Sequence, residues 1–229
     1  MKEAILLLHG LLMNPAEMGY VNYQLQKAHY DVHALGYQTV FKTTEQNVDL
    51  ILKKLKERNL KEFHIVAHSL GGLVAINLLD RIKKEKLPFN VNKIVLLGSP
   101  IKGSKIAKEL IDNKALKFIV KNAYPNALDG TAPLEILEDF DTLMISGDKR
   151  RGLSFLIGGF NQTTLKDVIR NIEPDENSLD HDGTVLLSET QSEFIDQQQT
   201  IDDSHTSMLF SKDVTDRIIN FLKTNNDTS

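Results

Sequence analysis

The sequence contains no cysteine among its 229 residues. This absence excludes disulfides, thiolate metal sites and a cysteine nucleophile. Charge of neither sign dominates, because 27 lysines and arginines stand against 31 acidic residues, a formal net charge of -4. Since a chain of this charge offers no basic face to a phosphate backbone, we expect no nucleic-acid partner.

Long hydrophobic runs are also missing. The apolar run near the N-terminus, residues 4–8, is far shorter than the roughly 18 residues needed to span a bilayer. It also lacks the length and the cleavage site of a signal peptide. We therefore expect a soluble, cytoplasmic protein without a transmembrane segment, and nothing in the sequence supports peripheral membrane contact.

Five short apolar runs bounded by turn residues predict buried parallel strands. These runs are residues 4–8, 32–35, 63–67, 94–97 and 143–145. Amphipathic helical patterns alternate with them, which predicts an α/β fold. We expect a doubly wound, mostly parallel sheet of about six strands with helices on both faces, forming a single domain over residues 1–229.

Helix start signals support this alternation. Thr43 and Gln46 have the spacing of a capping box ahead of an amphipathic helix. A second helix is predicted from Leu70 to a point before Pro88, and a last one from an N-cap at Ser211.

Two insertions interrupt the alternation, at residues 101–140 and 149–179. Neither is long enough to form a second domain. Insertions after strand ends lie over the carboxyl edge of such a sheet, so the first is expected to form a small cap, and the second precedes a candidate acid loop. The pocket beneath them should be shallow or partly open, with Leu116, Phe118 and Phe155 as candidate apolar lining.

The densest chemical signal is the segment FHIVAHSLGG at residues 63–72. An apolar strand runs directly into Ser69 and then into an amphipathic helix. A nucleophile elbow requires small residues two before and two after the serine, and Ala67 and Gly71 meet this requirement. Helix N-capping alone would also place a serine here, but it would not explain the buried strand before it.

A second motif, LLLHGLL at residues 6–12, ends the first predicted strand. A tetrahedral acyl intermediate needs two preorganised N–H donors, and the backbone amides of Leu11 and Leu70 are the candidates. His9 and His68 are expected to shape this loop and the elbow. His64 and His68 lie four apart on a strand rather than on a helix, so no metal site is expected.

On these two motifs the chain resembles the α/β-hydrolase superfamily, and within it the compact bacterial lipases and esterases with an Ala-His-Ser-x-Gly-Gly elbow. The commoner pattern has glycine where this chain has Ala67. The resemblance implies a triad in the order serine, acid, histidine. Only His181 and His205 follow Ser69 in the chain. His205, just before the last predicted helix, stands where the family places the base, whereas His181 is the alternative and is expected to be exposed.

The acid has three candidates. Asp182 lies in an Asp-Gly-x-Val sequence that lipase-like relatives use for the acid, and an Asp-Gly pair also makes an ordinary turn. Asp148 follows a predicted strand but runs into basic residues, and Asp180 is the third possibility. We favour Asp182.

The resemblance implies a serine hydrolase that cleaves a small-molecule or lipid carboxylic ester through an acyl-enzyme and needs no cofactor. A thioesterase, an amidase or an acyltransferase would use the same residues. A noncatalytic binding protein on the same fold is the alternative from another class, because fold does not determine function.

Overall fold

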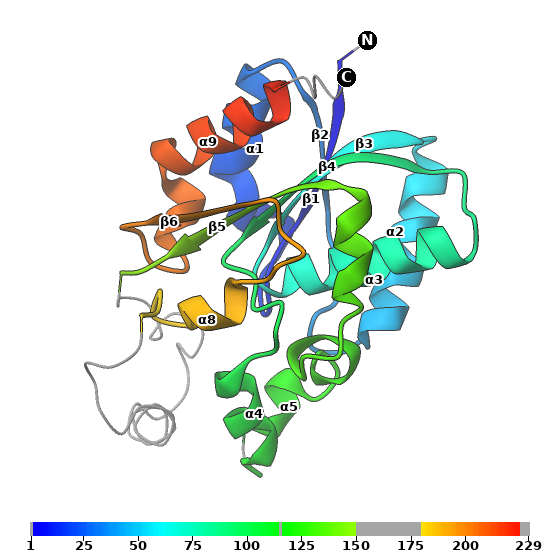
Figure 1. Ribbon diagram of the computed structural model, residues 1–229. Helices are drawn as coiled ribbons and strands as arrows, with labels where there is room; N and C mark the ends of the chain where they lie inside the picture. The colour runs from blue at the N-terminus through cyan, green and yellow to red at the C-terminus, as the bar shows by residue number, and fades with distance from the viewer. Residues whose placement is uncertain (1, 115, 150–179, 225–229) are drawn as a thin grey trace.

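The computed structural model describes residues 2–114, 116–149 and 180–224. Within these ranges six strands form one sheet in the order β2-β1-β3-β4-β5-β6, and all neighbours are parallel (Figure 1). The strands are β1 (Ala4–Leu8), β2 (Asp31–Leu35), β3 (Glu62–His68), β4 (Asn90–Leu97), β5 (Asp141–Gly147) and β6 (Gln197–Ile201).

Helices connect these strands. The α-helices of the described residues are α1 (Gly19–Lys27), α2 (Thr44–Glu57), α3 (Leu70–Lys84), α4 (Lys105–Asp112), α5 (Lys117–Val120), α8 (Leu187–Thr190) and α9 (Lys212–Lys223). Shorter or irregular turns are η1 (Pro15–Met18), η2 (Tyr124–Leu128), η3 (Leu134–Asp139) and η4 (Ser207–Phe210). In the part of the chain that is described, no helix combines the length and the apolar character that crossing a membrane requires.

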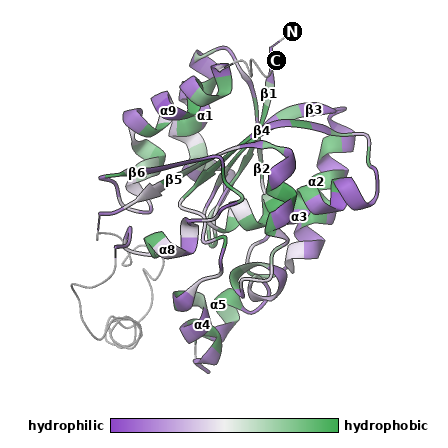
Figure 2. Cartoon of the chain, viewed as in Figure 1, coloured by the Kyte–Doolittle hydropathy of each residue, from purple (hydrophilic) through white to green (hydrophobic). Residues whose placement is uncertain are grey.

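The sheet has a hydrophobic core on each face, which confirms the predicted doubly wound α/β fold. Along β1, Leu6 and Leu8 pack in the core under α2 and α3, whereas Ile5 and Leu7 pack in the core under α1 and α9. Figure 1 shows the two helix pairs on opposite sides of the sheet, and Figure 2 shows hydrophobic residues along the central strands. Burial on both faces explains why these strands are continuously apolar.

The five predicted strands are confirmed, but the sequence did not locate the sixth. Strand β6 has the sequence QQQTI, and four of its five residues are exposed or half-buried. Among the described residues it pairs with β5 alone and lies at the edge of the sheet. An edge strand without two buried faces has no need of an apolar run, so its sequence resembled a loop.

The three predicted helices are confirmed. Thr43 and Gln46 form the expected capping box at α2, helix α3 ends at Lys84, and the Ser211 side chain caps α9 by accepting from the Val214 amide. Helix α1 was not predicted from the sequence.

Residues 101–140 include α4, α5, η2 and η3. Helices α4 and α5 lie beyond the end of the sheet where β1 and β3 end (Figure 1), whereas η3 packs along α3 and leads into the start of β5. That these residues act as a small cap stays a prediction. The second insertion, 149–179, lies outside the described residues except for Lys149.

Candidate active site

Ser69 occupies the turn between β3 and α3. Its backbone has φ 54° and ψ -125°, a conformation that residues with a Cβ rarely adopt. The Ser69 amide donates to the Leu97 carbonyl at 2.9 Å, so the turn begins while the chain is still paired with β4. Helix α3 starts at the next residue. The structure therefore has the sharp strand-to-helix turn that the sequence predicts.

Gly71 allows this turn to lie against the end of β1. A Cβ at Gly71 would stand 2.6 Å from the Leu8 carbonyl oxygen and 2.8 Å from that of His9, closer than a carbon atom can approach. A Cβ at Gly10 would similarly stand 3.1 Å from the Ser69 Cβ. The two glycines thus bring the loop after β1 directly beside Ser69.

We expect Gly71→Ala to lower the free energy of unfolding by about 1–3 kcal/mol, because the methyl group must push β1 and α3 apart. Gly19→Ala is a matched control: Gly19 lies in the first turn of α1, as Gly71 does in α3, but a Cβ there meets nothing within 4 Å. The control should leave stability unchanged or raise it by up to about 1 kcal/mol. Urea unfolding of both variants measures the difference. Equal stability of the two would contradict this account of Gly71.

Asp182 and His205 form a buried pair. The His205 Nδ1 lies 2.7 Å from the Asp182 Oδ2, and both residues are less than 5% exposed. Because a carboxylate only accepts, Nδ1 carries the proton and donates it, which leaves Nε2 of the neutral ring as an acceptor. The His205 amide also donates to the Asp182 carbonyl at 2.9 Å, so main chain and side chain both fix the pair.

The loop at 182–185 prepares Asp182 for this role. The second carboxylate oxygen accepts from the amides of Thr184 at 2.9 Å and Val185 at 2.8 Å. Burial alone would raise the pKa of Asp182, but His205 and these two amides outweigh it and lower the pKa. The carboxylate is therefore held ionised. Gly183 supplies the positive φ of 93° that this turn uses.

The other candidates for acid and base lie elsewhere. Asp148 and Asp180 are both exposed. His181 is half-buried rather than exposed as expected, because it belongs to the same turn: its Nδ1 accepts from the Gly183 amide at 3.0 Å. The structure therefore brings Asp182, of the three acids considered, to His205.

Two further histidines support the surrounding loops. The His68 Nε2 donates to the His205 carbonyl at 2.9 Å, and the two rings lie 4.6 Å apart. Burial, helped by the neighbouring His205, lowers the pKa of His68 to about 3, so this ring is neutral. His9 stacks on Tyr37 at 4.2 Å, and the Tyr37 hydroxyl donates to the His9 carbonyl. These contacts hold the loop after β1 and the segment that carries His205.

An apolar cavity of about 50 Å³ adjoins Ser69. Its walls come from the loop after β1, the elbow, the predicted cap and the loop that follows Asp182. The lining residues are Leu11, Ser69, Leu70, Pro100, Ser104, Ile106, Ala107, Leu110, Val120, Leu128, Thr184 and Val185.

The two candidate donor residues, Leu11 and Leu70, thus flank Ser69 in this lining. The Leu70 amide belongs to the first turn of α3, where amides have no acceptor within the helix. Of the side chains predicted to line the pocket, Leu116 is instead buried in the core and Phe118 is exposed at 54%. Phe155 lies outside the described residues.

No three residues of the types that ligate metals come together in the part of the chain that is described. His64 is buried, and its Nε2 lies 3.8 Å from the Glu3 carboxylate near the start of β1, whereas His68 contacts His205.

Solved structures of very different sequence share this fold. The lipase BlEst2 of Bacillus licheniformis in its mature form is 19% identical, with a TM-score of 0.71 over 98% of this chain and 93% of that chain. Against its propeptide form the identity is 20% and the TM-score 0.69, over 100% of this chain but only 52% of that chain. The lin2722 gene product of Listeria innocua is 16% identical, with a TM-score of 0.63 over 99% and 96%. These likenesses assign the α/β-hydrolase fold.

The sequence also matches a described protein family. Residues 1–133 match the family described as "Domain of unknown function (DUF7379)". The matched range includes Ser69, Leu11 and Leu70 and stops before Asp182 and His205. No curated protein matches the sequence.

Proposed function

The chain belongs to the DUF7379 family, and from the residues gathered on its α/β-hydrolase fold we propose that it is a serine hydrolase that cleaves a carboxylic ester through an acyl-enzyme. The observation that carries the proposal is the buried Asp182–His205 pair, 2.7 Å apart. Its tautomer leaves an unprotonated nitrogen on the histidine, as a general base requires.

The proposed mechanism uses side chains and backbone alone. His205 Nε2 takes the proton of Ser69 Oγ as the oxygen attacks the ester carbonyl. The amides of Leu11 and Leu70 donate to the oxyanion of the tetrahedral intermediate. His205 then gives the proton to the departing alkoxide, and the alcohol leaves. Water, activated by the same histidine, hydrolyses the acyl-enzyme and regenerates Ser69.

Asp182 acts through His205. Its carboxylate orients the ring and stabilises the imidazolium that forms when the serine proton is transferred. Three hydrogen bonds to the carboxylate, from His205, Thr184 and Val185, keep it ionised and fixed for this purpose. The likeness to a structure described as a lipase supports the assignment to ester chemistry.

The small cavity beside Ser69 suits a short acyl chain. We expect kcat/KM for p-nitrophenyl esters to fall by at least about tenfold from butyrate to octanoate, because added methylenes overpack a filled cavity at a cost of about 1–3 kcal/mol. Steady-state kinetics over the ester series measures this. Flat rates across the series that persist in Ser69→Ala would overturn the esterase proposal.

A matched pair of leucines sharpens the chain-length test. Leu110 lines the cavity, whereas Leu116 is buried nearby without lining it. Leu110→Ala should shift the preferred ester toward longer chains, and Leu116→Ala should not, although both lose a buried leucine. Thioester and amide substrates of the same acyl group distinguish the esterase from a thioesterase or an amidase.

A further inference from the structure

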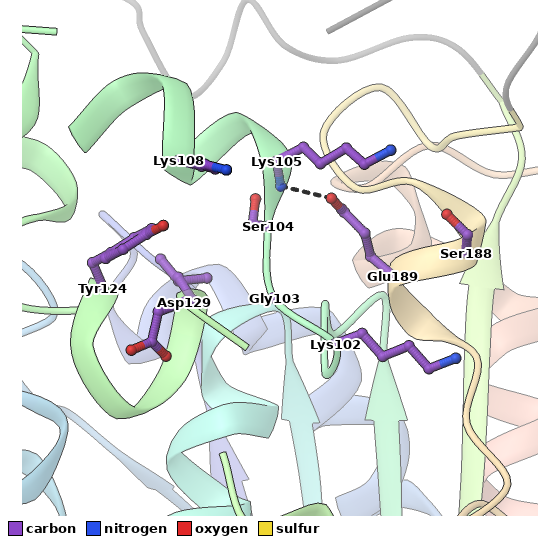
Figure 3. Close-up of a pocket in the computed structure, with 10 residues that line it drawn as sticks. Lys102, Gly103, Ser104, Lys105, Lys108, Tyr124, Asp129, Ser188 and Glu189 are labelled. Atoms are coloured by element: carbon purple, nitrogen blue, oxygen red, sulfur yellow. Dashed lines mark hydrogen bonds between the residues drawn. The ribbon is translucent and has the colours of Figure 1, made fainter. Parts of the chain in front are cut away.

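A second, larger pocket lies on the outer side of the cavity wall. It has a volume of about 280 Å³. Three of its lining residues are lysines, Lys102, Lys105 and Lys108, from α4 and the turn before it. Figure 3 shows Lys102 and Lys105 extending toward α8, which carries Ser188 and Glu189.

Positive charge is concentrated in this part of the chain. Residues 101–121 hold six lysines and two acidic residues, a formal charge of +4, although the whole protein carries -4. The remaining residues therefore carry a formal charge of -8. Such an asymmetry produces a local positive potential, which attracts an anionic group to this pocket rather than to the rest of the surface.

The lysines of the pocket form no close ion pair with its acidic residues in the described ranges. Burial raises the pKa of the Glu189 carboxyl, and the charge of Lys105 acts on it to offset part of this rise. In the described ranges, none of the three ammonium groups forms an ion pair. The buried Glu189 carboxylate accepts from the Lys105 amide at 2.7 Å (Figure 3) and from the Leu186 amide at 3.0 Å.

Asp129, the other acidic residue of the lining, is also engaged by its own loop. Its carboxylate accepts from the amides of Asn126 at 3.2 Å and Thr131 at 3.1 Å, and from the Thr131 hydroxyl at 2.8 Å. The acidic groups thus accept hydrogen bonds from the backbone and from Thr131, whereas none of the three ammonium groups has an ion-pair partner within the part of the chain that is described.

The lysine pocket and the Ser69 cavity share a wall. Ser104 and Leu128 line both, and the Ser104 amide donates to the Leu128 carbonyl at 2.9 Å. An ester whose acyl group fills the apolar cavity can therefore extend its alcohol part over this wall into the lysine pocket.

We propose that the substrate is an ester whose alcohol part carries an anionic group, a carboxylate or a phosphate, and that Lys102, Lys105 and Lys108 bind this group. This inference rests on the proposed esterase function and adds the class of substrate. Lysine suits the role because its ammonium group is a compact positive charge on a flexible stem and can donate hydrogen bonds to either anion.

The test compares 4-acetoxybenzoate with its neutral methyl ester, which share the acetyl group and differ in the charge of the alcohol part. The quantity measured is the ratio of kcat/KM for the anionic to the neutral substrate. Replacing all three lysines by glutamine should lower this ratio by about tenfold, since each exposed charge contact contributes modestly. In the wild type the ratio should also fall when salt is raised to about 0.5 M, because screening weakens exposed charge pairs.

The control is a triple variant at the other edge of the sheet, Lys27→Gln, Lys61→Gln and Lys223→Gln. These lysines are exposed and removing them changes the net charge equally. The ratio should stay at the wild-type value in this variant. An unchanged ratio in the first triple variant, or an equal fall in the control, would overturn the lysine pocket while leaving the esterase proposal intact. Failure of the wild type to hydrolyse either ester faster than Ser69→Ala would overturn both.

A third substrate, 4-acetoxyphenyl phosphate, carries a phosphate in place of the carboxylate. Comparing its kcat/KM with that of 4-acetoxybenzoate shows which anion the lysines favour.

Discussion

Ser69→Ala should lower kcat for a p-nitrophenyl ester by about 10⁴- to 10⁶-fold, because the nucleophile and the covalent intermediate are lost together. Binding and the two oxyanion amides would be retained, so a small rate above that of water is expected to persist. The alanine side chain fits the same turn, since only the hydroxyl is removed. Thermal unfolding of the variant should therefore be close to that of the wild type.

A fluorophosphonate probe gives an independent readout of the same residue. It should label the wild type at Ser69 and fail to label Ser69→Ala. Ser99→Ala is a matched control, since Ser99 is another buried serine beside α3, and its hydroxyl has no hydrogen-bond partner among the described residues. That control should be labelled normally. Labelling that survives Ser69→Ala would show that another residue is the nucleophile. Absence of labelling in folded wild-type protein would favour a noncatalytic binding protein.

Asp182→Asn should lower kcat by about 10⁴-fold. An asparagine can present its NH₂ group to His205, which favours the tautomer with the proton on Nε2 and removes the base. Asp148→Asn and Asp180→Asn serve as matched controls, because both aspartates lie near the same edge but are exposed. They should leave kcat within a few-fold of the wild type. A larger loss in Asp148→Asn than in Asp182→Asn would show that the acid is assigned to the wrong residue.

The pH dependence of stability adds a second readout for Asp182. Although burial acts to raise the pKa of Asp182, its partners lower it in the folded protein. The carboxylate therefore contributes stability that is complete above its unfolded pKa of about 3.9 and is lost as the pH falls through the folded pKa. The stability difference between wild type and Asp182→Asn should accordingly shrink below about pH 4, as measured by urea unfolding.

The elements that could be predicted are those whose burial or backbone geometry requires particular residue types within a few consecutive positions. Strands β1 to β5 are apolar because helices cover both of their faces. The turn at Ser69 requires Gly71 within two residues, and the loop at Asp182 requires Gly183 next to it, so each motif is visible in a few consecutive letters. Strand β6 imposes no such requirement, because pairing along one edge is a backbone property that its glutamines do not encode.

The lining of the two pockets could not be predicted in the same way. Leu128 and Val185 reach the cavity from segments far apart in the chain, and only the packing of η2 and the loop after Asp182 brings them together. Leu116 and Phe118 were chosen for their apolar character, but Leu116 is buried in the core and Phe118, in α5, is exposed. The lysine pocket depends likewise on α8 approaching α4 across 84 residues of sequence, through Glu189.

The backbone of Ser69 bears on whether the protein is an enzyme at all. A side chain held at φ 54° and ψ -125° costs about 1–3 kcal/mol that glycine would largely avoid. If the turn served only to connect β3 to α3, Ser69→Gly would raise the free energy of unfolding at no cost to function. The strained backbone at Ser69 therefore supports the proposed role of its hydroxyl as the nucleophile.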